Sequence, residues 1–214
     1  MIISYIKRME IEVDTLPEPR TRGRPREFDI DLALDRAIEV FSTRGYHGTA
    51  ISDLSEAMEL TPGSIYKAFK DKRGILLAAF DRYRLLRSRK LKAAIDPHVV
   101  GRDKVRAALR FYAEAAQGTL GQCGCLVVTT ATELAVSDPV VGERVALAHA
   151  TNEAVMNDCI LLGQSDGSIP AGINAADTAR ALLCLLQGMR VLGKTGRSHA
   201  QMIAVADVAM KLLD

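Results

Sequence analysis

The chain has 214 residues, of which 48% are hydrophobic and 25% charged, and its formal net charge is +2. This balance is typical of a globular chain with a hydrophobic core, and it excludes a wholly disordered or collagen-like protein. The 29 alanines and 24 leucines, against only 5% aromatic residues, favour helices over strands.

The chain shows no signal for a membrane or for secretion. No apolar run reaches the length that spans a bilayer, and residues 1–12 lack the continuous apolar stretch of a secretory signal. We therefore expect a cytoplasmic protein without a membrane partner. In that compartment the four cysteines are expected to be reduced thiols rather than a disulfide framework.

Positive charge is concentrated in the first part of the chain. Residues 1–92 carry 18 Lys and Arg against 14 Asp and Glu, whereas residues 93–214 carry 10 against 12. The excess is greatest around Arg22, Arg24 and Arg26. A basic segment ahead of a folded region is a candidate phosphate contact, and Arg24 and Arg26 could enter a minor groove. The alternative is a solvated linker that adds only nonspecific attraction.

Residues 1–21 show no sustained periodicity and are expected to be a flexible extension. A first helix is predicted over residues 30–44, with Asp29 or Asp31 as its cap and Gly45 at its end. Thr49 can cap a second, short helix that breaks at residues 59–63.

A third short helix is expected to open at Pro62, with Thr61 as its cap, because proline is tolerated in the first turn. A longer amphipathic helix follows over residues 73–94. The remaining apolar periodicity predicts helices over residues 102–118, 125–136, 139–164, 175–194 and 198–213. The expected fold class is therefore all-α, with about nine helices.

Residues 49–69 have the pattern of a helix-turn-helix, in which two short helices are joined by a tight turn. Apolar Ile51, Leu54, Ile65 and Phe69 can hold one face of this unit in a core. The other face of the second helix would then present its first-turn side chains to base edges in a DNA major groove.

The same region resembles the DNA-binding domain of the TetR repressor family. The resemblance covers about residues 22–80 and is carried by Gly45-Tyr46-His47-Gly48-Thr49, Ile51, Leu54, Leu60, Gly63-Ser64-Ile65-Tyr66, Phe69 and Lys72. It implies an all-α homodimer with a DNA-binding domain at residues 22–72 and a ligand-binding and dimerisation domain at residues 73–214.

The resemblance also implies roles for single residues. Thr49, Tyr66 and Lys72 match positions that contact phosphates, and the recognition-helix surface is matched by Thr61, Pro62, Ser64 and Lys67. Many members of the family have an aromatic residue or histidine after the tyrosine. This chain has Lys67 and Ala68 there, so no base preference is carried over.

The last two expected helices resemble the pair that forms a four-helix bundle across the two-fold axis of the family dimer. The residues expected at that interface are Leu182, Leu186, Met189, Val205, Val208, Ala209 and Leu212. The alternative is a hairpin that buries both faces within one chain. A dimer would double the base contacts of one short helix on a palindromic operator.

Residues 102–164 are expected to form a ligand pocket that is apolar with few polar anchors, as is usual for small molecules. The residues assigned to it are Phe111, Tyr112, Cys125, Val128, Thr132, His149, Asn152 and Met156. Cys125 lies in a Gly-Cys-Leu segment that resembles the opening of the sixth helix in one branch of the family.

Three interpretations of Cys123 and Cys125 stay open. Cys125 can be a small buried hydrophobic residue, or either thiol can be activated at a helix N-terminus and sense oxidants or electrophiles. A Cys-x-Cys pair can also bind a soft metal such as copper. Two thiolates do not complete a tetrahedral site, so we assign no metal and no cofactor.

The sequence therefore predicts a DNA-binding regulator, in the form of a homodimeric repressor that a small, mostly apolar molecule releases from its operator. An enzyme is not expected, because the chain has no nucleophile elbow, phosphate loop or His-Glu-x-x-His pair. A helical protein-interaction adaptor is a further alternative, but it would leave the basic segment and the helix-turn-helix spacing unexplained.

Overall fold

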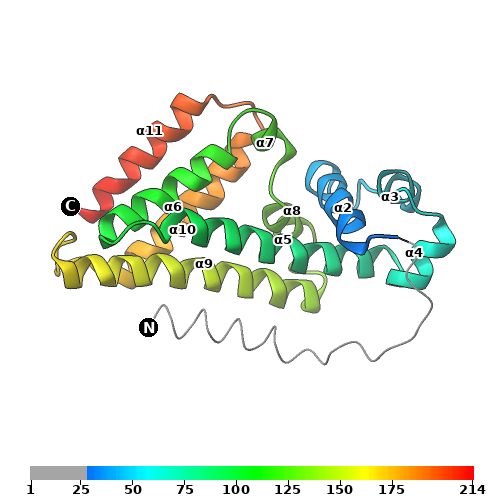
Figure 1. The fold of residues 1–214 in the computed structure, drawn as a ribbon, viewed down its shortest axis with the longest axis horizontal. Coiled ribbons are helices and arrows are strands. Elements are labelled where there is room, and N and C mark those ends of the chain that lie inside the picture. The colour runs from blue at the N-terminus through cyan, green and yellow to red at the C-terminus, as the bar shows by residue number, and fades with distance from the viewer. Residues whose placement is uncertain (1–27) are drawn as a thin grey trace.

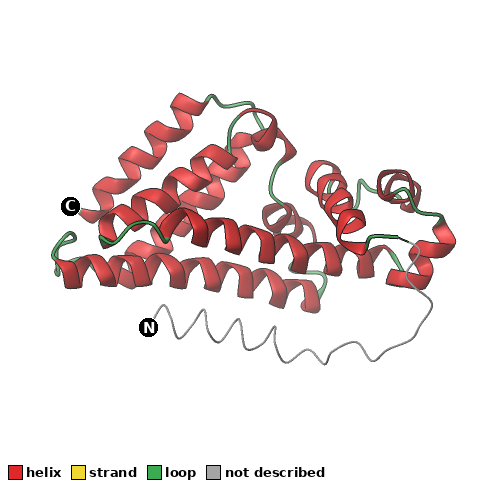
Figure 2. Cartoon of the chain, viewed as in Figure 1, coloured by secondary structure: helices red, strands yellow, loops and turns green. Residues whose placement is uncertain are grey.

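The computed structural model describes residues 28–214, and within that range every regular element is a helix (Figure 2). The all-α prediction is confirmed. None of these helices is long and apolar enough to cross a membrane. In chain order the elements are α2 (Ile30–Arg44), α3 (Ile51–Met58), α4 (Pro62–Phe69), α5 (Lys72–Ile95), α6 (Gly101–Ala115), α7 (Gly118–Cys123), α8 (Leu126–Leu134), α9 (Pro139–Asp166), α10 (Ala175–Gly193), α11 (His199–Ala209) and a final 3₁₀ turn, Met210–Leu213.

The molecule is elongated, with α2–α4 at one end and α6, α7, α10 and α11 towards the other (Figure 1). Two buried clusters correspond to these ends. One joins α2–α4 to the first half of α5, to α8 and to the start of α9, around Phe41, Leu54 and Phe80. The other joins the end of α5 to α6 and α9–α11, around Leu109, Ile160 and Leu182. Helix α5 contributes to both clusters, so packing continues across the domain boundary expected after residue 72.

The starts of the first helices follow local capping chemistry. Asp29 caps α2 by accepting hydrogen bonds from the backbone N–H groups of Asp31 and Leu32. Thr61 caps α4 through a bond from Ser64 N to its Oγ1 at 3.3 Å, with Pro62 in the first turn, as predicted.

Helix α3 begins differently from the prediction, because Ala50 rather than Thr49 is its N-cap residue. The first turn is held instead by Asp53, whose carboxylate accepts from Ala50 N at 2.7 Å.

The segment between α6 and α8 also differs from the prediction. The helix expected over residues 102–118 ends at Ala115, and residues 118–123 form the separate short helix α7. A Cβ at Gly121 would lie 2.7 Å from the backbone of Ala116 and 3.0 Å from the carbonyl oxygen of Gly193. The missing side chain of Gly121 therefore allows α7 to pack closely against α10.

An ion pair joins the start of α5 to the start of α9. Arg73 binds Asp138 through two hydrogen bonds, one of them from Nη2 to Oδ1 at 2.9 Å. Asp138 also caps α9 by accepting from the backbone N–H groups of Val140 and Val141. The Arg73 guanidinium, followed by these backbone bonds, lowers the pKa of Asp138 to about 2.

Asp138→Asn is therefore expected to remove an acid-dependent part of the stability. A carboxyl whose pKa falls on folding stabilises the protein above its unfolded value, about 3.9, and loses that contribution as the pH approaches 2. Asparagine still caps a helix, so the change isolates the charge. Urea unfolding at pH 5, 4, 3 and 2 should show the difference between wild type and variant shrinking as the pH falls. A difference that stays constant would contradict this assignment.

Candidate nucleic-acid interface and cavity

Helix α4 has one buried face and one exposed face. Ile65 and Phe69 are 0% and 7% exposed and pack into the core of α2–α5. Tyr66 is 52% exposed, and Lys67, Thr61 and Pro62 are also exposed, whereas Ser64 is half-buried beside Thr61. The residues expected on the recognition surface therefore share the outward side of a short helix whose other side is fixed.

The turn between α2 and α3 is held from two sides. Lys72 Nζ donates to the carbonyl oxygens of Tyr46 and Thr49, both at 2.8 Å, and lies 4.2 Å from the centre of the Tyr46 ring. Thr49 is 2% exposed, and its hydroxyl donates to Gly45 O at 2.5 Å. This burial contradicts the expectation that the Thr49 side chain contacts phosphate, because the turn already uses its hydroxyl.

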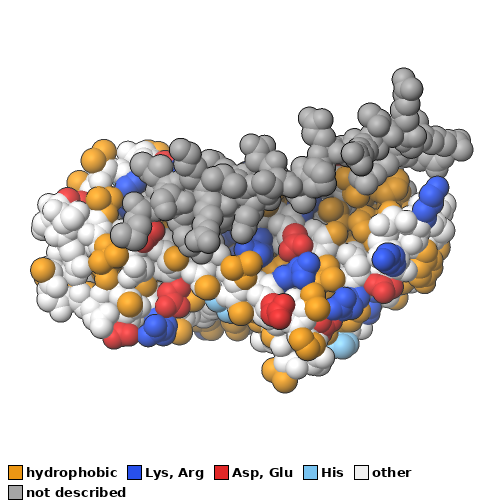
Figure 3. Space-filling view, turned by 90° about the horizontal axis from the view of Figure 1, so that it is seen from below, with side chains coloured by type: hydrophobic (Ala, Val, Ile, Leu, Met, Phe, Trp, Pro, Cys, Tyr) orange, Lys and Arg blue, Asp and Glu red, His pale blue; other side chains and the backbone are white. Residues whose placement is uncertain are grey.

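Exposed positive charge lies beside α4. Lys67 and Lys70 are exposed, and neither forms an ion pair with another residue of 28–214. In contrast, Arg36 and Arg44 are paired with Glu59 and Asp53 at 2.9 and 2.8 Å. Lys and Arg side chains occur among acidic ones from the middle of the molecule to the end that carries α2–α4 (Figure 3). Arg24 and Arg26 lie outside the described residues.

The link from α4 to α5 is strained. Lys70 has φ +70° and ψ −50°, and Asp71 N donates to Phe69 O at 2.9 Å, which is the geometry of a tight γ-turn. Such a backbone persists only where the surrounding packing fixes it. The turn keeps the exposed Lys70 directly after the last residue of α4.

Lys72→Ala is expected to weaken binding to every duplex by a similar factor and to reduce the slope of log K against log salt by about 1. Two of the three ammonium protons are used within the turn, which leaves one for a phosphate. Salt titrations with specific and random duplexes would measure this effect. Lys90→Ala, in an exposed part of α5, is the control, and an unchanged slope for Lys72→Ala would remove Lys72 from the interface.

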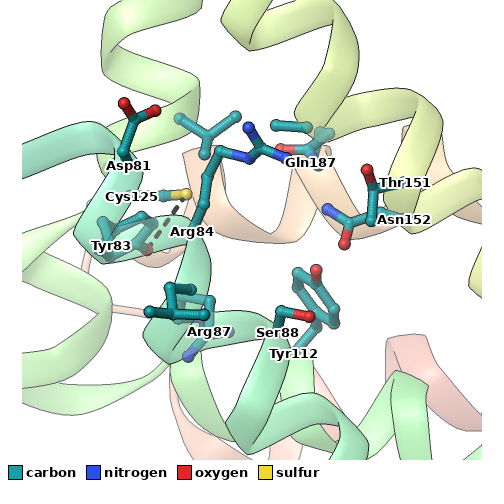
Figure 4. Close-up of a pocket in the computed structure, with 13 residues that line it drawn as sticks. Asp81, Tyr83, Arg84, Arg87, Ser88, Tyr112, Cys125, Thr151, Asn152 and Gln187 are labelled. Atoms are coloured by element: carbon teal, nitrogen blue, oxygen red, sulfur yellow. Dashed lines mark hydrogen bonds between the residues drawn. The ribbon is translucent and has the colours of Figure 1, made fainter. Parts of the chain in front are cut away.

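A cavity of about 440 Å³ lies in the other part of the molecule, between α5, α6, α8, α9 and α10 (Figure 4). Three of the residues assigned to a pocket from the sequence line it: Tyr112, Cys125 and Asn152. Its remaining lining is Asp81, Tyr83, Arg84, Leu85, Arg87, Ser88, Val127, Ala148, Thr151 and Gln187. More polar side chains reach the lining than the sequence led us to expect, although apolar atoms supply most of its surface.

The other five residues assigned to the pocket lie elsewhere. Met156 is fully buried in the core, and Phe111 lies beneath Arg87 with its ring centre 4.3 Å from the guanidinium carbon. The Thr132 hydroxyl is bonded to its own helix, at Val128 O and Thr129 O. Val128 and His149 are half-buried outside the cavity wall, and burial lowers the pKa of His149.

Helix α5 supplies lining residues that sequence reasoning missed. Arg84, Arg87 and Ser88 follow the i, i+3, i+4 spacing of one helix face, which is the only sequence signal for their shared direction. The amphipathic pattern of this helix predicted a buried face but no contribution to a cavity wall.

The cysteines differ in their surroundings. Cys125 is 8% exposed at the N-cap of α8, and the Tyr83 hydroxyl donates to its Sγ at 3.4 Å. Burial raises the pKa of Cys159 to about 11. Residues 28–214 contain no group of three or more His, Cys, Asp or Glu side chains that could hold a metal. The thiol-responsive and copper-responsive alternatives stay predictions.

Four of the residues expected at a dimer interface face the interior of their own chain. Leu182 and Leu186 are 0% exposed, and Met189 and Ala209 are 2% and 3% exposed. Val205 is half-buried, whereas Val208 and Leu212 are 62% and 44% exposed. The opposite side of α10 is also apolar and exposed, with Leu185, Val191 and Leu192 on it. The four buried side chains are therefore used within their own chain, and a dimer interface on α10 and α11 stays a prediction.

The arrangement at α2–α5 defines the class of protein. A short, capped helix with an exposed polar and cationic edge is braced by a second short helix and fixed by a buried core. A major groove admits an α-helix, and a helix held in this way can place its first turn against base edges. The chain is a helix-turn-helix DNA-binding protein.

Comparison with known proteins gives the family. Residues 33–79 match the model of the bacterial regulatory proteins of the TetR family, and residues 101–207 match the tetracyclin repressor-like C-terminal domain. The chain belongs to the TetR family of transcriptional regulators.

Relatives match over most of the chain. It is 28% identical to the HTH-type transcriptional repressor ComR of Escherichia coli K12 over 198 residues, 90% of this chain and 92% of ComR. It is 28% identical to the repressor DhaR of Mycobacterium sp. GP1 over 78% of this chain and 82% of DhaR. A structure of a cysteine mutant of the regulator CifR with 26-base-pair operator DNA has a TM-score of 0.80 and 29% identity, and the match covers 90% of this chain and all of that one.

Proposed function

We propose that this chain is a ligand-released transcriptional repressor that binds a palindromic operator as a homodimer. Its family, its exposed recognition helix and the names of ComR and DhaR support repression, and the CifR complex supports operator DNA as the target. The chain works in the cytoplasm and catalyses no reaction. One observation carries the regulatory part: helix α8 connects the cavity to the helix-turn-helix.

The two ends of α8 contact the two parts of the molecule. At its start, Cys125 and Val127 form part of the cavity wall. Near its end, Glu133 Oε2 accepts hydrogen bonds from the backbone N–H groups of Tyr46 at 2.7 Å and His47 at 3.0 Å. Since these two residues form the turn before α3, a shift of α8 reaches the recognition unit through a direct polar contact.

Two further contacts cross between the same parts. Lys194, at the end of α10, donates from Nζ to Ser42 O at 3.1 Å, and Arg73 is paired with Asp138. A molecule that fits the cavity better when α8 has moved would shift the population towards that state, by no more than its difference in affinity for the two states. In the shifted state the two recognition helices of a dimer no longer match their half-sites.

The dimer surface that we propose is the outer face of α10 and α11. Its exposed side chains follow helical spacing on both helices, as expected for a continuous apolar stripe. The residues on this face are Ala181, Cys184, Leu185, Gly188, Val191 and Leu192 on α10, Ala204 and Val208 on α11, and Leu212 in the final 3₁₀ turn. Large exposed apolar surfaces of this kind mark interaction sites, and a second copy presents the same stripe.

Leu185→Glu is the variant that tests this proposal, because it places a charge in the stripe without touching the core. We expect light scattering to give the 23.2 kDa of one chain instead of twice that mass. Operator binding should weaken, because a monomer contacts only one of the two half-sites. Val99→Glu, at an exposed loop residue, is the matched control and should leave the dimer intact. A Leu185→Glu variant that remains dimeric would contradict the proposed face.

A further inference from the structure

We propose that the cavity binds a small organic carboxylate whose charged end is held by Arg87, with the buried Arg190 adding positive charge near Tyr112 of the cavity wall. This inference rests on the proposed function, because it names the class of molecule that the cavity takes as an effector. It departs from the mostly apolar ligand expected from the sequence.

Aromatic side chains contact the Arg87 guanidinium, but no carboxylate of the described residues balances its charge. Its carbon Cζ lies 4.3 Å from the ring centre of Phe111 and 5.5 Å from that of Tyr112, which is within the range of a cation–π interaction. Its Nη2 is buried and has no hydrogen-bond partner among residues 28–214, and no carboxylate of that range forms an ion pair with the guanidinium. Contacts with aromatic rings use none of the N–H donors of the guanidinium.

Arg190 brings a second positive charge to the same region. It is 4% exposed, and Nη2 donates to the carbonyl oxygen of Gly124, whereas Nε and Nη1 are buried and have no hydrogen-bond partner in the described part of the chain. Burial raises the pKa of Tyr112 to about 12, and the charges of Arg87 and Arg190 oppose that rise, which places both guanidinium groups near a residue of the cavity wall.

The polar part of the lining fits the charged end of such a molecule, and the apolar part fits its carbon chain or ring. Buried guanidinium groups without a counter-ion are costly, and a carboxylate can accept two parallel hydrogen bonds from one of them. Leu85, Val127 and Ala148 offer apolar contacts for a carbon chain or ring. Asp81 also lies in the lining, and Arg144 pairs with it at 3.3 Å, so its negative charge is balanced within the protein and does not oppose the carboxylate.

The lining also contains an unpaired acceptor. Gln187 Oε1 is buried and has no hydrogen-bond partner, and the residue faces the cavity from α10 (Figure 4). A hydroxyl or amide N–H on the carbon part of the ligand would satisfy it. The site is therefore built for a monocarboxylate, with room for one donor away from the charge.

The test uses the full-length protein and four acids, butanoate, octanoate, benzoate and phenylacetate, each beside its uncharged amide. Calorimetric titration and thermal unfolding should show at least one acid binding ten-fold or more tightly than its amide. Arg87→Gln should reduce the affinity for that acid by ten-fold or more. Arg89→Gln is the control, since Arg89 is exposed on the same helix and absent from the cavity wall.

Two results would overturn the inference: no acid binds better than its amide, or Arg87→Gln and Arg89→Gln bind the acid alike. If Arg87→Gln does not fold, the comparison of acid with amide in the unchanged protein decides. Operator binding measured without any acid separates the two proposals. If the protein binds its operator but no acid, only the proposal of a carboxylate ligand is wrong. If it binds no operator, the proposed repressor function is wrong.

Discussion

Replacing Tyr66 and Lys67 together by alanine is expected to weaken operator binding by about 100-fold or more, because each good contact to a base edge is worth about 1–3 kcal/mol. Both side chains project from the exposed edge of α4. Anisotropy titrations with a labelled operator, at fixed salt, would measure the loss. The free energy of unfolding should change by no more than about 0.5 kcal/mol, since neither side chain fills the core.

The control for this variant is Lys211→Ala, which removes the same charge from the far end of the chain and should leave operator affinity nearly unchanged. Nonspecific binding separates the roles of the two side chains. Loss of a base contact affects the operator more than a random duplex, whereas loss of a phosphate contact affects both alike. Wild-type affinity in the double variant would show that α4 does not read the DNA.

Gly45→Ala is expected to destabilise the protein by about 2–4 kcal/mol, because two costs add at one position. Gly45 has φ +76°, a left-handed conformation that alanine adopts only with strain. An added Cβ would also lie 1.9 Å from Glu133 Oε1, the carboxylate that binds the turn before α3. The substitution therefore strains the turn between α2 and α3. The added methyl group also collides with Glu133 at the end of α8.

The Glu133 contribution can be separated by a double-mutant cycle. If the collision is real, Gly45→Ala should cost less in a Glu133→Ala background, with an interaction energy of about 0.5–3 kcal/mol. Chemical unfolding of the four proteins gives the cycle. Gly172→Ala is the control, since a Cβ there meets nothing within 4 Å and the free energy should barely move. Strictly additive costs would show that Glu133 and the turn are not coupled.

Local signals predicted the helix-turn-helix well because its geometry is set by nearby residues. The cap at Thr61, the proline in the first turn and the alternation of buried Ile65 with exposed Tyr66 all lie within one short segment. The burial of Thr49 could not be predicted in this way. Its hydroxyl has two possible bonding partners, the start of α3 or Gly45 O, and the packed turn selects the second.

The errors in the C-terminal half have a different physical origin. Helix α10 is apolar on both sides, so periodicity shows that Leu182 and Val191 point in opposite directions but not which one faces its own core. The cavity depends on five helices that are far apart in the sequence. No local pattern places Arg87 of α5 beside Phe111 of α6, and hence none reveals a positive charge without a partner.

The central claim is that α4 reads a specific DNA sequence, and selection of bound fragments from a random duplex library tests it most directly. The purified wild-type chain should enrich one motif with two inverted half-sites. The Tyr66→Ala/Lys67→Ala variant should enrich none. A wild-type protein that retains random fragments without enrichment would contradict the claim that this chain is a sequence-specific repressor.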